Sequence, residues 1–225
     1  MATEGLTQKT IALVLYPGLT FFDLAGPLRV FAGVSDLAPE YRTVTVGERA
    51  EPMDTETRVR MIPIHTFREV PDPYVLLVPG GGLPTLRAMG SEPIRSYVRS
   101  AVSAAEVAGS VCTGTLILAS VGLLEGRRAT THWAYHKVLE ELGATYVRKR
   151  WVEDGKFISS AGVSAGIDMA LALAARLTDE ETARRVQRSV GYDHLEALSA
   201  AARAGLSLAA PLIAAGPKWL TRQNR

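Results

Sequence analysis

The chain has 225 residues and a mass of 24.2 kDa, and 47% of its residues are apolar and 21% charged, which excludes a disordered or collagen-like protein. Its 25 Lys and Arg residues exceed its 23 Asp and Glu residues by two, and the basic residues are scattered along the sequence. Because no basic stripe could follow a phosphate backbone, we expect no nucleic-acid partner.

The single cysteine excludes an intramolecular disulfide and fits a reducing compartment, so we predict a cytoplasmic protein. The N-terminus lacks a basic segment followed by an apolar stretch, so we expect no secretory signal. The most apolar segment near the C-terminus is shorter than the roughly 20 residues that cross a bilayer, so we expect no membrane association.

Short apolar runs alternate with helical patterns along the chain. The predicted strands cover residues 10–16, 41–48, 55–64, 74–82, 107–112 and, as two strands joined by an Asp-Gly turn, 146–160. The predicted helices cover residues 24–34, 93–108, 113–124, 134–142, 164–177 and 179–190. The run 74–82 is continuously apolar and ends in three glycines, which predicts a central strand buried on both faces of a sheet.

Strands that alternate with helices predict an α/β fold, in which a mostly parallel central sheet carries helices on both faces and ligands bind near the carboxyl ends of the strands. We expect one domain over residues 1–193. The Ala-rich segment 194–225 is interpreted as a C-terminal extension of the same domain.

Cys112 follows a predicted strand and precedes a predicted helix, in the run SVCTG. Backbone N–H groups at the start of a helix favour a thiolate, so this position predicts a nucleophile. Thr113 adds a hydroxyl beside it, and Gly114 permits close approach of the backbone. The alternative is that Cys112 is a small buried apolar residue.

Two further strand ends carry polar or flexible residues. Gly81 and Gly82 close the central strand, and their N–H groups could stabilise negative charge as an oxyanion hole, or simply form a tight turn. Asp23 follows the first strand and could either cap the next helix or exchange a proton with Cys112. The second role requires the strand ends to meet at one edge of the sheet.

His132 and His136 are four residues apart, but no further ligand completes a metal set, so we expect no metal. Surface or helix-capping roles fit them better. His65 and His194 are isolated in the sequence, and nothing marks either as the base of a Cys-His pair.

Four segments together resemble the ThiJ/PfpI superfamily, and more narrowly its isonitrile hydratase branch. They are FFDLAGPLRVF, LLVPGGG, SVCTGTLILASVGLLEGRRATTHWAYHKVLEELGA and AGVSAGIDMALALAARL, and the resemblance spans about residues 10–192. It implies a flavodoxin-like sandwich of the class I glutamine amidotransferase type, a homodimer and no cofactor. The implied reaction hydrates an isonitrile to an N-substituted formamide, as a hydro-lyase, through a covalent thioimidate.

Carried over by residue, the resemblance makes Cys112 the nucleophile, Asp23 its acidic partner and Thr113 the residue beside the reacting atoms. Relatives tend to have Glu-Tyr where this chain has Gly191-Tyr192, so we expect the pocket rim or the dimer contacts to differ from theirs. The alternatives are a stand-alone redox sensor, since a reactive thiol oxidises readily, and another cysteine activity of the superfamily such as glyoxalase, deglycase or peptidase chemistry.

Overall fold

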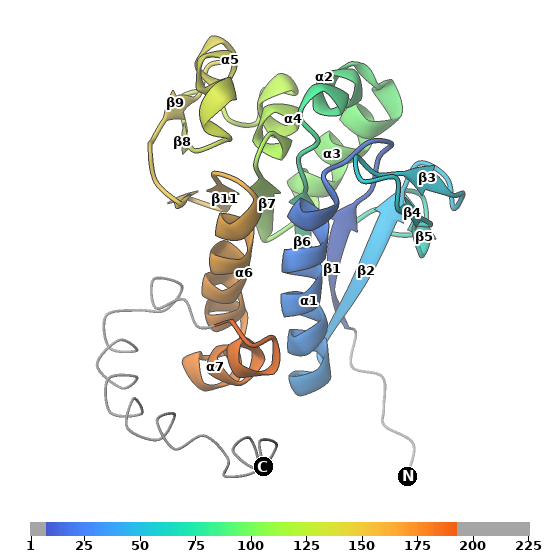
Figure 1. Ribbon diagram of the computed structural model, residues 1–225, viewed down its shortest axis with the longest axis vertical. Helices are drawn as coiled ribbons and strands as arrows, with labels where there is room; N and C mark the ends of the chain where they lie inside the picture. Colours follow the sequence, from blue (N-terminus) through green and yellow to red (C-terminus); the bar gives the residue numbers. More distant parts are fainter. Residues whose placement is uncertain (1–7, 193–225) are drawn as a thin grey trace, which may run out of the picture.

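The computed structural model describes residues 8–192, so the predicted extension 194–225 and His194 lie outside the described residues (Figure 1). A seven-stranded sheet forms the centre of this part of the chain. In spatial order its strands are β10 (Trp151–Asp154), β11 (Phe157–Ser160), β7 (Val107–Val111), β6 (Val75–Val78), β1 (Lys9–Val14), β2 (Tyr41–Gly47) and β5 (His65–Thr66).

All neighbouring strands of this sheet are parallel except β10, which is antiparallel to β11. The apolar run of β6 occupies the middle of the sheet and is completely buried, as its sequence predicts. The α/β class and the mostly parallel sheet are therefore confirmed.

Helices lie on both faces of the sheet. On one face α1 (Phe21–Leu37) packs beside α6 (Val163–Leu177), and both contact α7 (Glu180–Ser189). Figure 1 shows α1 and α6 side by side in front of the sheet, with α3 (Glu92–Ala104) behind it. The remaining helices are α2 (Leu83–Gly90), α4 (Gly114–Ser120), the short 3-10 helix Trp133–Tyr135 and α5 (His136–Glu141). Among residues 8–192, no helix has both the length and the apolar character needed to cross a membrane.

The predicted strand at 55–64 is wrong. This region instead forms a separate antiparallel pair, β3 (Met53–Asp54) and β4 (Arg60–Met61). The hydroxyl and N–H of Thr55 both donate to the Val59 carbonyl at 3.0 Å, which closes a turn where the sequence suggested continued extension.

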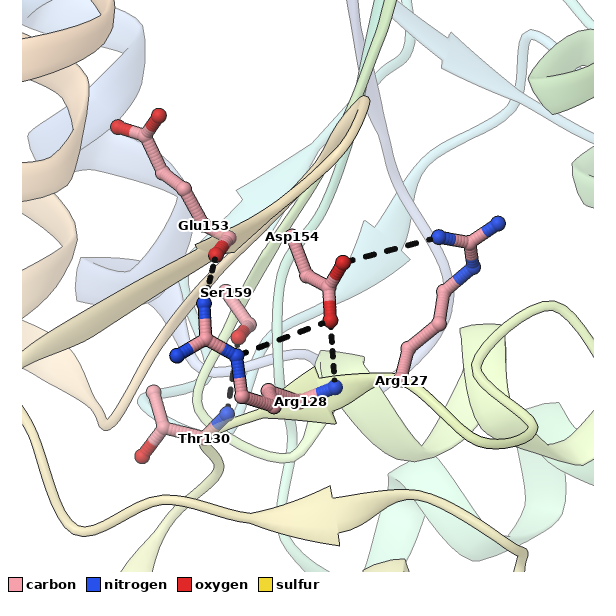
Figure 2. A network of polar contacts seen from close by, with 6 residues as sticks. All are labelled: Arg127, Arg128, Thr130, Glu153, Asp154 and Ser159. Atoms are coloured by element: carbon pink, nitrogen blue, oxygen red, sulfur yellow. Dashed lines mark hydrogen bonds and ion pairs between the residues drawn. The ribbon is translucent and has the colours of Figure 1, made fainter.

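The predicted 146–160 hairpin is shorter than expected, because Thr145–Tyr146 forms strand β9, which pairs in parallel with β8 (Arg128–Ala129). Polar contacts connect β8 to the β10–β11 hairpin (Figure 2). The Asp154 carboxylate accepts the Arg128 N–H at 2.8 Å, and the Ser159 hydroxyl accepts the Thr130 N–H at 2.9 Å. These bonds hold β8 and the residue that follows it against the β10–β11 hairpin.

Candidate active site

The strand order β2-β1-β6-β7-β11 is the flavodoxin-like order, in which the switch point lies between β1 and β6. Ligands of such sheets bind in the crevice outside the carboxyl ends of the strands at that point. Asp23 follows β1, Gly81 and Gly82 follow β6, and Cys112 follows β7. The residues that the sequence singled out therefore lie at the edge of the sheet where a ligand is expected.

Cys112 forms a sharp turn between β7 and α4. Its φ angle of 56° is in the left-handed region, which residues other than glycine rarely adopt. Its N–H donates to the Ser160 carbonyl at 2.9 Å, and its carbonyl accepts the Thr131 hydroxyl at 2.9 Å. Both backbone groups are thus fixed by neighbouring segments, and this strained turn resembles the nucleophile turns of α/β enzymes.

Two glycines allow the backbone to pass close to this turn. A Cβ atom at Gly114 would collide with the Val78 carbonyl, which confirms the close approach expected there. A Cβ atom at Gly80 would lie 2.8 Å from three polar atoms, namely Asp23 Oδ2 and the backbone nitrogen and Oγ1 of Thr113. Asp23 and Thr113 therefore surround a single point in front of Gly80.

Asp23 is the third residue of α1 and is completely buried. The N-cap of α1 is Thr20, so the interpretation of Asp23 as the helix cap is wrong. Neither carboxyl oxygen makes a hydrogen bond of good geometry within the described chain, although the Cys112 thiol and the Gly80 N–H lie close enough to lower its pKa. Burial outweighs these contacts and raises the pKa of Asp23 to about 7.

The thiol of Cys112 does not have the lowered pKa that its position before a helix suggested. Burial, followed by the negative charge of Asp23, raises its pKa to about 12. The Thr113 N–H and hydroxyl act in the opposite direction but do not compensate. The start of the helix alone predicts a lowered pKa, but the desolvation of the sulfur, which lies outside that local pattern, outweighs it.

Cys112 and Asp23 form a buried pair, and each appears among the causes of the other's pKa shift. Since two negative charges cannot be held together in a desolvated site, the pair keeps one proton above pH 7. The singly protonated pair can place this proton on sulfur or on the carboxylate. It therefore contains both a latent nucleophile and a latent acid.

Thr113 lies beside this pair, and its hydroxyl is fully engaged. The N–H groups of Gly81 and Gly82 donate to Thr113 Oγ1 at 3.0 and 3.1 Å. In this arrangement the two glycines hold Thr113, whereas an oxyanion role would require their N–H groups to exchange this acceptor for a substrate. That role stays a prediction.

Sequence reasoning missed three residues that surround the site. Tyr16 and Thr85 continue the hydrogen-bonded chain that begins at Thr113. Gly162 faces the sulfur, because a Cβ atom there would lie 4.0 Å from Cys112 Sγ and 3.8 Å from the His132 ring. Tyr16 and Gly162 each follow a strand of the sheet, which is the signal that could have found them.

The two histidines of the HWAYH run do not share a helical face. His132 caps the 3-10 helix by accepting the Ala134 N–H at 3.3 Å, which confirms a capping role, and His136 begins α5. Within residues 8–192, no three His, Cys, Asp or Glu side chains gather closely enough to hold a metal ion.

Large apolar side chains are exposed next to the residues of the site. Leu83 is 70% exposed beside Gly82, and Trp133 is 74% exposed beside His132. Phe22, beside Asp23, and Val163, beside Gly162, are exposed as well. Cys112 itself is only 6% exposed. Cys112 is thus nearly buried, whereas the apolar residues next in sequence to Asp23, Gly82, His132 and Gly162 are exposed.

The model of the DJ-1/PfpI family matches residues 9–176, which include β1, β6, β7 and the turn at Cys112. The chain belongs to this family. The match confirms the resemblance to ThiJ/PfpI proteins that the sequence motifs indicated.

Among family relatives, the chain is 40% identical to an isonitrile hydratase of Pseudomonas putida over 183 residues, which are 81% of this chain and 78% of that protein. Among solved structures, it resembles a ThiJ/PfpI family protein from Pseudomonas syringae, with a TM-score of 0.78 and 31% identity over 91% of this chain and 87% of that one. Drosophila melanogaster DJ-1beta has the same fold, with a TM-score of 0.75 and 21% identity over 83% of this chain and all of that one.

Proposed function

We propose that this protein hydrates isonitriles to N-substituted formamides, with Cys112 as nucleophile and Asp23 as proton donor and acceptor. The observation that carries the proposal is the buried pair, in which Asp23 has a pKa of about 7 and lies beside the thiol. Its 40% identity to an isonitrile hydratase supports the same reaction.

The first step needs a nucleophile and a proton at the same atom. The terminal carbon of R–N≡C accepts the sulfur and a proton, so the S–H bond breaks while S–C and C–H bonds form. Asp23 takes the proton from sulfur and delivers it to the carbon, which leaves the thioimidate Cys112–S–CH=N–R. A carboxyl group whose pKa is near 7 suits both halves of this transfer.

The second step regenerates the thiol. Water adds its oxygen to the thioimidate carbon and a proton to nitrogen, giving a tetrahedral adduct. Collapse of the adduct breaks the C–S bond, and the hydroxyl proton passes to sulfur through Asp23, which releases H–C(=O)–NH–R. Thr113 and the N–H groups of Gly81 and Gly82 would orient the adduct or stabilise charge that develops on it.

The surroundings of the sulfur favour a slim reactive group on an apolar body. An isonitrile is linear and carries its reacting carbon at the tip, so it suits a thiol that is only 6% exposed. The exposed Leu83 and Trp133 suit an aryl or alkyl substituent that stays outside. We also expect a homodimer, as the family resemblance implies, and a cytoplasmic location, because the thiol must remain reduced.

The proposal is tested by incubating the purified chain with one aryl isonitrile, one alkyl isonitrile and, separately, methylglyoxal. We expect the formyl proton of the formamide to appear by NMR with both isonitriles. Cys112→Ser should abolish this turnover while the circular dichroism spectrum stays unchanged. Full turnover by that variant would exclude Cys112 as the nucleophile.

The same assay separates the alternatives. Turnover of methylglyoxal alone would assign the chain to the glyoxalase or deglycase activities of the superfamily. Inactivity on all three compounds, together with rapid oxidation of Cys112 by hydrogen peroxide, would favour a redox sensor. The raised pKa of Cys112 argues against the sensor, because oxidation proceeds through the thiolate.

A further inference from the structure

The backbone of Cys112 keeps an unfavourable conformation, so contacts from outside the turn must hold it there. Its φ angle of 56° is in the left-handed region, where the Cβ atom of a residue other than glycine crowds the backbone. Strand β7 ends at Val111 and helix α4 begins at Gly114, so no regular element fixes the turn between them. A strained conformation of this kind persists only where the surrounding structure over-determines it.

Two hydrogen bonds hold the peptide groups on either side of Cys112. Its N–H donates to the Ser160 carbonyl at 2.9 Å, and its carbonyl accepts the Thr131 hydroxyl, also at 2.9 Å. Ser160 and Thr131 are both completely buried. The Thr115 N–H also approaches the Cys112 carbonyl, but its distance of 3.5 Å is longer than an ordinary N–H···O bond. The Thr131 hydroxyl is therefore the closer of the two donors to this carbonyl.

Both of these bonds depend on strand β11. Ser160 is the last residue of β11 and accepts the N–H of Cys112 directly. The hydroxyl of Ser159, the preceding residue of the same strand, accepts the Thr130 N–H at 2.9 Å and so fixes the segment that carries Thr131 (Figure 2). One strand thus holds the N–H of Cys112 through Ser160 and its carbonyl through Thr131. Because the two contacts lie on opposite sides of one residue, they restrict both its φ and its ψ angle.

We propose that Thr131 is a positioning residue, whose hydroxyl holds the Cys112 carbonyl and so keeps the turn in the left-handed conformation that places the sulfur. The proposal rests on the proposed function only in taking Cys112 as the nucleophile. Ser160 restrains the other side of the turn with a backbone carbonyl, which any residue at that position would supply. Thr131 acts through its side chain, so its restraint is a property of this residue and can be removed by substitution.

The consequence for the reaction is a loss of alignment rather than a loss of substrate binding. Thr131→Val replaces the hydroxyl by a methyl group, which leaves the Cys112 carbonyl with the long contact to Thr115 and lets the strained turn relax. The sulfur then leaves its productive position, and a misplacement of about 1 Å can cost about 10²-fold in rate. We expect kcat for an aryl isonitrile to fall by about tenfold or more, while KM stays within about twofold of the wild type.

The conformation of the turn is tested by NMR on the single cysteine of the chain, which gives one set of signals when cysteine is labelled with carbon-13. In Thr131→Val the carbonyl signal of Cys112 should move upfield, because its hydrogen bond is lost. The Cα signal should move as well, because its position depends on the φ and ψ angles of the residue. Thr131→Ser keeps the hydroxyl and should restore both signals and the wild-type kcat.

The matched control is Thr130→Val, at the preceding position. Thr130 is equally buried, and its hydroxyl also donates to a backbone carbonyl, that of Lys149, at 3.2 Å. Valine at this position keeps the backbone N–H that Ser159 accepts. The control therefore removes a buried threonine hydroxyl from the same segment but leaves the bond to the Cys112 carbonyl in place. Both signals of Cys112 and the kcat should stay unchanged.

A Cα signal of Cys112 that keeps its wild-type position in folded Thr131→Val would overturn the proposal, as would an unchanged kcat. Equal changes in Thr130→Val would also overturn it, because general loosening of the segment would then be the cause. If Thr131→Val does not fold, Thr131→Ala decides, since it lacks the hydroxyl and puts no methyl group in its place. The NMR signals need no substrate. If the wild type shows no hydration of isonitriles, the proposed function is refuted and the signals alone decide on Thr131.

Discussion

Asp23→Asn should make the protein more stable and nearly inactive at the same time. Asp23 is buried without a hydrogen bond of good geometry, and its pKa is raised from 3.8 to about 7. A carboxyl whose pKa is raised by folding stabilises the protein fully below its unfolded pKa, and this contribution is lost as the pH rises from about 4 to about 7.

The size of the effect follows from the shift. About three pKa units at about 1.4 kcal/mol per unit give about 4 kcal/mol, which is the cost of the buried negative charge at pH 8. Asparagine is a neutral mimic of protonated aspartate and avoids this cost. The free energy of unfolding of Asp23→Asn should therefore exceed that of the wild type by about 4 kcal/mol at pH 8, and by less than half of that at pH 5.

The activity should move in the opposite direction. Asparagine cannot exchange a proton with the thiol, and general acid-base groups typically contribute 10²- to 10⁴-fold to a rate, so formamide production should fall by about 100-fold or more. Unfolding in urea at pH 5 and pH 8, combined with the NMR assay on an aryl isonitrile, measures both quantities on the same preparation.

Asp168 provides the matched control, because it is equally buried but paired. Its carboxylate accepts the Tyr192 hydroxyl at 2.7 Å and forms an ion pair with Arg150. Asp168→Asn should lower the free energy of unfolding by about 1 to 3 kcal/mol at pH 8. A loss of stability at pH 8 in Asp23→Asn, or near-normal turnover, would refute the interpretation of Asp23 as a functional group kept at the expense of stability.

Three further predictions concern the same site. The kcat/KM for isonitriles should rise as the pH increases through about 7, because below that pH both Cys112 and Asp23 are protonated and the pair has no nucleophile. Asp23→Asn should remove this rise. A flat pH profile of the wild type would contradict the prediction. Gly80→Ala should reduce kcat by about 100-fold, because its Cβ atom would lie 2.8 Å from Asp23 Oδ2. An unchanged kcat would show that position 80 and Asp23 are not in contact. Leu83→Ser should raise the KM for an aryl isonitrile roughly tenfold and leave the KM for methyl isonitrile unchanged. Equal changes of KM for both compounds would show that Leu83 does not contact the substituent.

The location of the site could be predicted because its residues stand at the ends of strands. Gly81 and Cys112 follow apolar runs that are easily recognised as buried parallel strands, and parallel strands end at one edge of a sheet. The rule requires no knowledge of side-chain packing. It therefore placed Asp23 and Cys112 in the same region although 89 positions separate them in the sequence.

The hydrogen-bond pattern within the site could not be predicted in the same way. Thr113 accepts from glycines more than 30 positions away, and its third partner, Thr85, lies in a helix whose neighbouring residues Leu83 and Leu86 are exposed. A single inward-facing hydroxyl in such a helix has no sequence pattern. Only the packing of α2 against α4 reveals that Thr85 belongs to the site.

The ionisation of the thiol shows most clearly where local reasoning ends. The turn from β7 into α4 predicts a lowered pKa for Cys112, but the direction is reversed by burial and by Asp23, which lie outside that segment. A thiol that rests protonated cannot attack until its proton has a destination. An isonitrile accepts that proton at the same carbon that accepts the sulfur, whereas an amide or aldehyde accepts it at a different atom. The burial that suppresses the free thiolate therefore favours a substrate that accepts sulfur and proton at one atom.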